Sequence, residues 1–195
     1  METDKLKLKD LVTIGIFVLI YFIASFAIGT PFGFTVIGFL FYPMVMAILT
    51  GVVTMFFMAK TPKKWAVFLF FFLPGLIMTL MGHTVIVAIH SLIIALIAEF
   101  VHRSKGLKSI KGNILTHAIG SMYAIGSFWQ IYIMSDKYYA MTVELMGKEY
   151  ADKLINLPLW VMLLLYISVF IGGLIGGKIG QKLLKKHFEK AGLVS

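Results

Sequence analysis

Long apolar stretches alternate with short polar joints along nearly the whole chain. A helix needs about 20 predominantly apolar residues to cross the hydrocarbon core of a bilayer, and six stretches reach or approach that length. The pattern therefore predicts an all-α integral membrane protein with six transmembrane helices in one membrane domain, residues 1–195. We place the spans at residues 11–29, 34–59, 65–81, 83–102, 111–134 and 158–184.

Glycine and proline residues predict where the helices end or bend. The sequence Gly29-Thr30-Pro31 predicts the end of the first span, because this combination is typical of turns. Pro43 lies inside the second span, where its missing N–H predicts a kink. Residues 135–157 are more polar, and apolar residues recur at helical spacing between residues 142 and 155. We expect an amphipathic helix that lies over the outer membrane surface.

Lysine and arginine residues follow the same segmentation. Fifteen of the 18 lie at the two chain ends and at the second and fourth joints, which an even number of spans places on one side of the membrane. They are Lys5, Lys7, Lys9, Lys60, Lys63, Lys64, Arg103, Lys105, Lys108, Lys111, Lys178, Lys182, Lys185, Lys186 and Lys190. Basic segments beside spans stay cytoplasmic. Both termini are therefore predicted to be cytoplasmic, and residues 135–157 external.

Composition narrows the possible functions. The net charge of +9 would suggest nucleic-acid binding in a soluble protein. Here the basic residues flank apolar spans, so we expect contact with anionic membrane lipid and no nucleic-acid partner. The chain has no cysteine, which excludes disulfides and thiolate metal sites. It also lacks a P-loop and the H-E-x-x-H and G-x-S-x-G motifs, so no enzymatic activity, bound cofactor or metal is expected.

Polar and aromatic side chains gather at the predicted external ends of the spans. Such groups are costly inside a bilayer and are candidates for function, and aromatic walls with a few hydrogen-bonding groups are typical of small-molecule pockets. An interfacial aromatic belt is the alternative interpretation. The candidate substrate-binding residues are His83, Tyr123, Trp129, Gln130, Asp136, Asn156 and Trp160.

Three further polar residues lie inside spans. His90 follows His83 at helical spacing, and a hydrogen bond between helices is its simpler interpretation. Glu99 can pair with Arg103 four residues later. His117 belongs to a stripe of small and polar residues on the fifth span, which favours close helix packing. Their roles in function stay open at this point.

The strongest local motif is a doubled G-x-x-x-G in the sixth span, formed by Gly172, Gly176 and Gly180. Small residues at this spacing let two helices approach closely in lipid. The partner helix is either internal or part of another protein.

Five segments carry a resemblance to a known family. They are LKLKDLVTIGIF at residues 6–17, FMAKTPK at 57–63, MGH at 81–83, GKEYAD at 147–152 and KLLKKHFEKAG at 182–192. Together with six short helices and a basic tail, they resemble the substrate-binding S-components of energy-coupling factor (ECF) transporters, in the MptD/Trep_Strep-like group. The segments are spread over nearly the whole chain.

The resemblance implies an S-component-like bundle in a bacterial cell membrane that captures a vitamin or related micronutrient outside. A transmembrane T-component and two ABC-type ATPases would be its partners, with ATP used by the ATPases while the S-component topples to deliver the ligand. The family's ligands lie in the outer half of the bundle, under the joint between spans one and two. Its contacts with the T-component involve small residues on span one. Here Gly15 is such a residue, but Leu19 follows four positions later.

Among S-component ligands, a thiamine-pathway pyrimidine would suit an aromatic wall with amide and imidazole groups. Two other classes of protein remain compatible with the sequence, a stand-alone secondary carrier and a polytopic membrane protein without a transport role.

Overall fold

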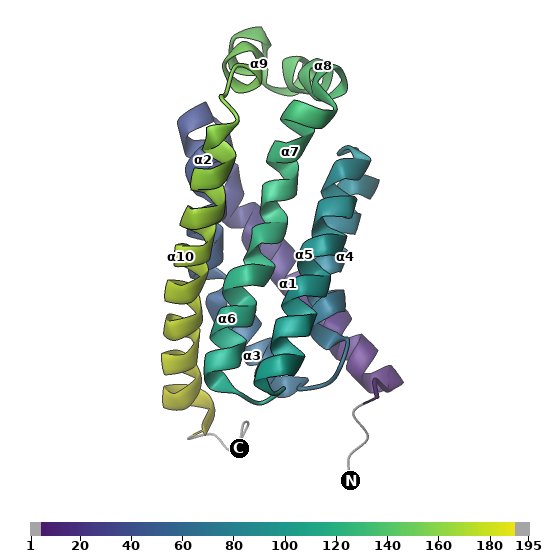
Figure 1. The fold of residues 1–195 in the computed structure, drawn as a ribbon, viewed down its shortest axis with the longest axis vertical. Coiled ribbons are helices and arrows are strands. Elements are labelled where there is room, and N and C mark those ends of the chain that lie inside the picture. Colours follow the sequence, from purple (N-terminus) through teal and green to yellow (C-terminus); the bar gives the residue numbers. More distant parts are fainter. Residues whose placement is uncertain (1–4, 190–195) are drawn as a thin grey trace.

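The computed structural model describes residues 5–189, with side chains described through residue 186, and this part of the chain is helical without any β-strand. The elements are α1 (Leu8–Gly33), α2 (Val36–Leu49), α3 (Gly51–Lys60), α4 (Ala66–Leu80), α5 (Val85–Lys105), α6 (Ile110–Gly120), η1 (Ser121–Ile125), α7 (Gly126–Ile133), α8 (Ser135–Met146), α9 (Lys148–Ile155), α10 (Trp160–Leu183) and η2 (Leu184–Glu189). The helices α5 and α10 run along the long axis of the bundle, α1 crosses behind them obliquely, and α8 and α9 lie across one end (Figure 1).

Membrane-crossing length is clear for part of this bundle. Within the described residues, α1, α5 and α10 are each long and apolar enough to cross a bilayer, and α2 with α3 makes a fourth candidate span bent by 40°. The apolar helix α4 has only 15 residues, and the fifth predicted span is divided. Six crossings and cytoplasmic termini thus stay predictions, and residues 1–4 and 190–195 at the termini lie outside the described residues.

The basic clusters come together at one end of the bundle. The start of α1, the α3–α4 and α5–α6 connections and the end of α10 all lie there, whereas α8 and α9 lie at the opposite end (Figure 1). We refer to the first as the basic end. The basic clusters that the sequence analysis predicted to share one side of the membrane therefore lie together in the fold, at the end opposite to α8 and α9.

One predicted helix boundary was wrong, and one helix break was not predicted. The first helix does not end at Gly29 but continues through Pro31 to Gly33, because a proline in the last turn leaves only one carbonyl without its usual donor. The second predicted span breaks at Thr50, between α2 and α3, whereas Pro43 lies inside the continuous helix α2. The break lies where Gly51 packs directly on the backbone of Gly176 in α10.

Two segments expected to be single helices are divided. The fifth predicted span tightens into a 3-10 turn, η1, between α6 and α7. The segment predicted to be external forms two helices, α8 and α9, which meet at Gly147 with φ 87°. A positive φ of this size suits glycine, so the chain turns there instead of continuing as one amphipathic helix.

The doubled G-x-x-x-G motif has an internal partner. A Cβ atom on Gly172 would lie 2.8 Å from the carbonyl oxygen of Met44, and one on Gly180 would lie 2.6 Å from that of Gly51. On Gly176 it would collide with the Ala47 carbonyl oxygen. The glycine face of α10 therefore packs on the backbone of α2 and α3 at the break.

We predict that Gly176→Ala lowers the stability of the purified protein by about 1–3 kcal/mol, because the added methyl group has no room and the backbones must separate. Gly15→Ala is the matched control, since a Cβ atom there meets nothing within 4 Å. Thermal unfolding in detergent, followed by tryptophan fluorescence, measures both. Equal melting temperatures for the two variants would contradict the packing described here.

Candidate functional site

A cavity of about 240 Å³ lies between α1, α2, α4, α5 and the η1–α7 segment, in the half of the bundle away from the basic end. It is lined by Phe22, Ser25, Phe26, Gly29, Thr30, Gly33, Phe39, Tyr42, Met78, Val87, Tyr123, Ala124 and Ser127. Aromatic rings and small side chains dominate this lining, and none of these residues carries a formal charge. The cavity is the candidate ligand site.

Three hydroxyl groups of the lining donate to backbone carbonyls. Ser25 donates to Tyr21 O at 2.8 Å, and Thr30 donates to Phe26 O at 2.8 Å. Tyr42 donates to the carbonyl oxygen of Ser25 at 3.3 Å. The oxygen atoms of these hydroxyls keep lone pairs that can accept a hydrogen bond.

The helices α8 and α9 are tied to the rim of the cavity. The Tyr150 hydroxyl in α9 donates to Gly33 O at 2.9 Å, and Gly33 lines the cavity at the end of α1. Within the pair of helices, Tyr139 donates to Asp152 Oδ1 at 2.8 Å, and this bond raises the pKa of Tyr139. The amphipathic segment predicted over the surface is thus anchored beside the candidate site.

Of the seven predicted substrate-binding residues, Tyr123 lines the cavity. Gln130 is buried and uses both polar atoms internally, since Oε1 accepts from Thr84 N at 3.1 Å and Nε2 donates to Ser127 O at 3.0 Å. It braces the start of α5 against α7 and is not among the lining residues.

Trp129 takes part in a partly buried hydrogen-bonded cluster that adjoins the cavity. Its Nε1 donates to the Tyr166 hydroxyl at 2.9 Å, and that hydroxyl lies 2.6 Å from His90 Nε2. His90 Nδ1 lies 3.3 Å from the carbonyl oxygen of Tyr123. Because a carbonyl can only accept, we assign the imidazole proton to Nδ1, so Nε2 accepts from Tyr166. The expected hydrogen bond of His90 between helices is present, and the cluster is satisfied internally.

The other four predicted residues lie apart from the cavity lining. His83 lies in the turn before α5, where burial lowers its pKa. Asp136 is in the first turn of α8, and the Asn156 amide donates to Asp152 O at 2.7 Å. Trp160 is 63% exposed at the start of α10 and lines a separate apolar groove against α2. Their roles in ligand binding stay predictions.

The sequence reasoning missed the contribution of the first two helices. Ser25 and Tyr42, in the first two predicted spans, and Thr30, in the predicted joint between them, all line the cavity. The signal was present, since Ser25, Gly29 and Thr30 interrupt an otherwise apolar run at about one helical turn. Had these small and polar residues been weighed in the same way as those of the fifth span, they would have been among the predicted site residues.

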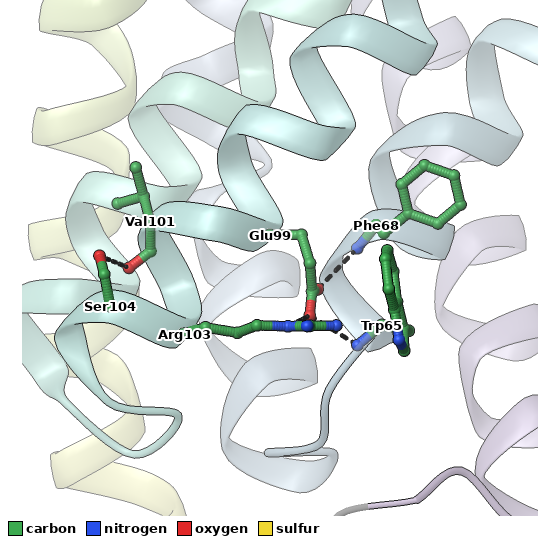
Figure 2. Close-up of polar contacts among 6 residues, drawn as sticks. All are labelled: Trp65, Phe68, Glu99, Val101, Arg103 and Ser104. Carbon is green, nitrogen blue, oxygen red and sulfur yellow. Dashed lines mark hydrogen bonds and ion pairs between the residues drawn. The ribbon is translucent and has the colours of Figure 1, made fainter.

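Glu99 caps a neighbouring helix at the basic end (Figure 2). It is 2% exposed and accepts hydrogen bonds from Trp65 N at 2.6 Å and Phe68 N at 3.1 Å, at the start of α4. Arg103 Nε lies 2.6 Å from Glu99 Oε1, which confirms the predicted pair, and the guanidinium lies 4.2 Å from the Trp65 ring centroid. Trp65 has φ 70°, an uncommon conformation for a bulky residue. The carboxylate therefore holds the entry to α4 in a specific geometry.

His117 forms a hydrogen bond next to the break between α2 and α3. It is fully buried, and Nε2 lies 2.8 Å from Ala47 O, in the last turn of α2. Carbonyls at a helix end lack regular intrahelical donors, so the imidazole supplies one from α6. The packing role predicted for this stripe thus takes the form of a hydrogen bond across helices.

Comparison with known proteins gives one match. A family model described as "Hypothetical bacterial integral membrane protein (Trep_Strep)" matches residues 8–190. No curated protein and no solved structure matches the chain.

We predict that Glu99→Ala lowers stability by about 2–4 kcal/mol, because it leaves Arg103 and the first N–H groups of α4 without their buried acceptor. Glu99→Gln should lose less, since its amide oxygen can still accept. The control is Glu149→Ala, which removes the exposed pair with Lys153 and should leave the melting temperature unchanged. If Glu99→Ala behaves like Glu149→Ala in thermal unfolding, the cap does not stabilise the fold.

At His117 we predict that the stability of a variant depends on the reach of the substituted amide. His117→Gln should keep most of the stability, because its amide nitrogen occupies nearly the position of Nε2. His117→Asn is one bond shorter and should lose about 1–3 kcal/mol, as expected for an unpaired buried carbonyl. Thermal unfolding of the two variants compares amides that differ only in reach, and equal losses would exclude the hydrogen bond as the reason for the histidine.

Proposed function

The chain belongs to the Trep_Strep family of bacterial integral membrane proteins, and from this premise we propose that it is the substrate-binding S-component of an ECF-type importer. In this proposal it lies in the cell membrane and captures a vitamin or related micronutrient on the external face. It then delivers the ligand by toppling on a module made of a T-component and two ABC-type ATPases.

The observation that carries the proposal is the cavity. It lies in the half of the bundle away from the basic end, and its lining is aromatic and uncharged. If basic segments are cytoplasmic, the cavity is in the external half, under the α8–α9 pair. A pocket of this lining suits the capture of a small organic molecule.

The chain has no ATP-hydrolysing motif of its own, and this supports the proposal that its partner subunits are ATPases. The sequence has no P-loop, so uptake driven by ATP needs another subunit. Gly15 offers a place where such a subunit can approach, because a Cβ atom there meets nothing within 4 Å in the described structure. Small exposed residues on a membrane helix favour close helix–helix contact, and α1 is thus the docking helix in this proposal.

The test is affinity purification of the tagged protein from native membranes. We expect a T-component and two ATPases to co-purify with the unmodified chain, and Gly15→Leu to lose them while it keeps its ligand. Mass spectrometry identifies both the partners and any retained small molecule. Recovery of a chain without partners that still transports its ligand would favour a secondary carrier instead. A chain that has neither partners nor ligand would contradict a transport role.

A further inference from the structure

The lining of the cavity restricts the chemistry of its ligand, if the proposed function holds. We infer that the ligand is a single flat heteroaromatic ring that carries amino or other N–H donors and no acidic group. Three properties of the site lead to this class, namely the direction of its hydrogen bonds, its charge and its size.

Three of the five hydroxyl groups in the lining already donate their protons within the fold. Ser25, Thr30 and Tyr42 donate to backbone carbonyls, whereas the other two hydroxyls belong to Tyr123 and Ser127. The oxygens of the first three residues can therefore accept from a ligand while their protons stay within the fold. A ligand that brings N–H groups satisfies these three acceptors, whereas a ligand that brings only carbonyl or carboxylate oxygens leaves them without a donor.

The charge of the site disfavours acids. None of the lining residues is Lys, Arg or His, so a carboxylate or phosphate would lose its hydration without gaining a counter-charge. The last turn of α1, which includes Gly33, also borders the cavity. The C-terminal end of a helix carries partial negative charge, so it attracts N–H donors and repels anions.

The size and the rings of the site favour one flat ring. An engineered apolar cavity of about 150 Å³ accepts benzene, and the volume here is about 240 Å³. That is room for one ring with short substituents. Phe22, Phe26, Phe39, Tyr42 and Tyr123 surround it, and aromatic rings prefer offset-stacked or edge-to-face neighbours.

The test uses the purified full chain in lipid nanodiscs and isothermal titration calorimetry. The probes are 4-amino-5-hydroxymethyl-2-methylpyrimidine, its analogue with methoxy in place of the amino group, and nicotinate as an anionic ring. We expect the amine to bind at least about tenfold more tightly than the methoxy analogue, since only the amine offers the donors, and nicotinate not to bind.

The variants locate the site. Ser25→Ala and Tyr42→Phe each remove an accepting oxygen and should weaken amine binding by about tenfold, while Ala124→Leu fills the cavity and should abolish it. Ser168→Ala is the matched control, because this serine on α10 also donates within its own helix but lies outside the cavity lining. It should bind like the unmodified protein.

Two kinds of result would overturn the inference. Two outcomes that are lost in Ala124→Leu would leave the proposed capture function intact. Equal or tighter binding of the methoxy analogue would reject the donor requirement, and binding of nicotinate would reject the exclusion of acidic ligands. No binding of the amine probe would also reject the ligand class. The proposed function would then be tested separately, by the co-purification of ATPase partners.

Discussion

The contact between the glycine face of α10 and the break at Thr50 is the constraint on which the rest of this fold depends. Lipid provides no hydrophobic force between apolar helices, so close packing and hydrogen bonds must hold them together. Gly172, Gly176 and Gly180 bring the backbone of α10 against α2 and α3. The break bends that span by 40°, and His117 supplies a donor to the last turn of α2. Backbone packing and hydrogen bonding therefore meet at one place.

The polar residues inside the bundle have mostly structural partners. Glu99 holds the start of α4, His90 joins α5 to α10 through Tyr166, and Gln130 connects α7 to the start of α5. Polar groups at membrane depth are by default candidates for function, but the hydrogen-bonding atoms of Glu99, His90 and Gln130 are used within the fold. The candidate ligand site is consequently a region of rings and hydroxyls without charge, and its polarity arises from the direction of its hydrogen bonds.

The two ends of the molecule differ in charge, and short helices lie across only one of them. Most of the lysine and arginine residues lie at one end, where Glu99 and Arg103 fix the entry to α4. The other is crossed by α8 and α9, which Tyr150 ties to the end of α1 at the rim of the cavity. The candidate ligand site and the basic end therefore lie in opposite halves of the bundle.

The sequence by itself determined the helical membrane class, the basic end and the Glu99–Arg103 pair, because hydropathy, charge and i,i+4 spacing are local properties. Only the tertiary structure revealed the break at Thr50 and the packing of α10 within the chain. It also added residues of α1 and α2 to the candidate site and placed the polar atoms of Gln130 in hydrogen bonds within the fold. The physical reason is that partners across helices, such as Ser25 with Tyr42, are set by packing between distant segments, which no local pattern encodes.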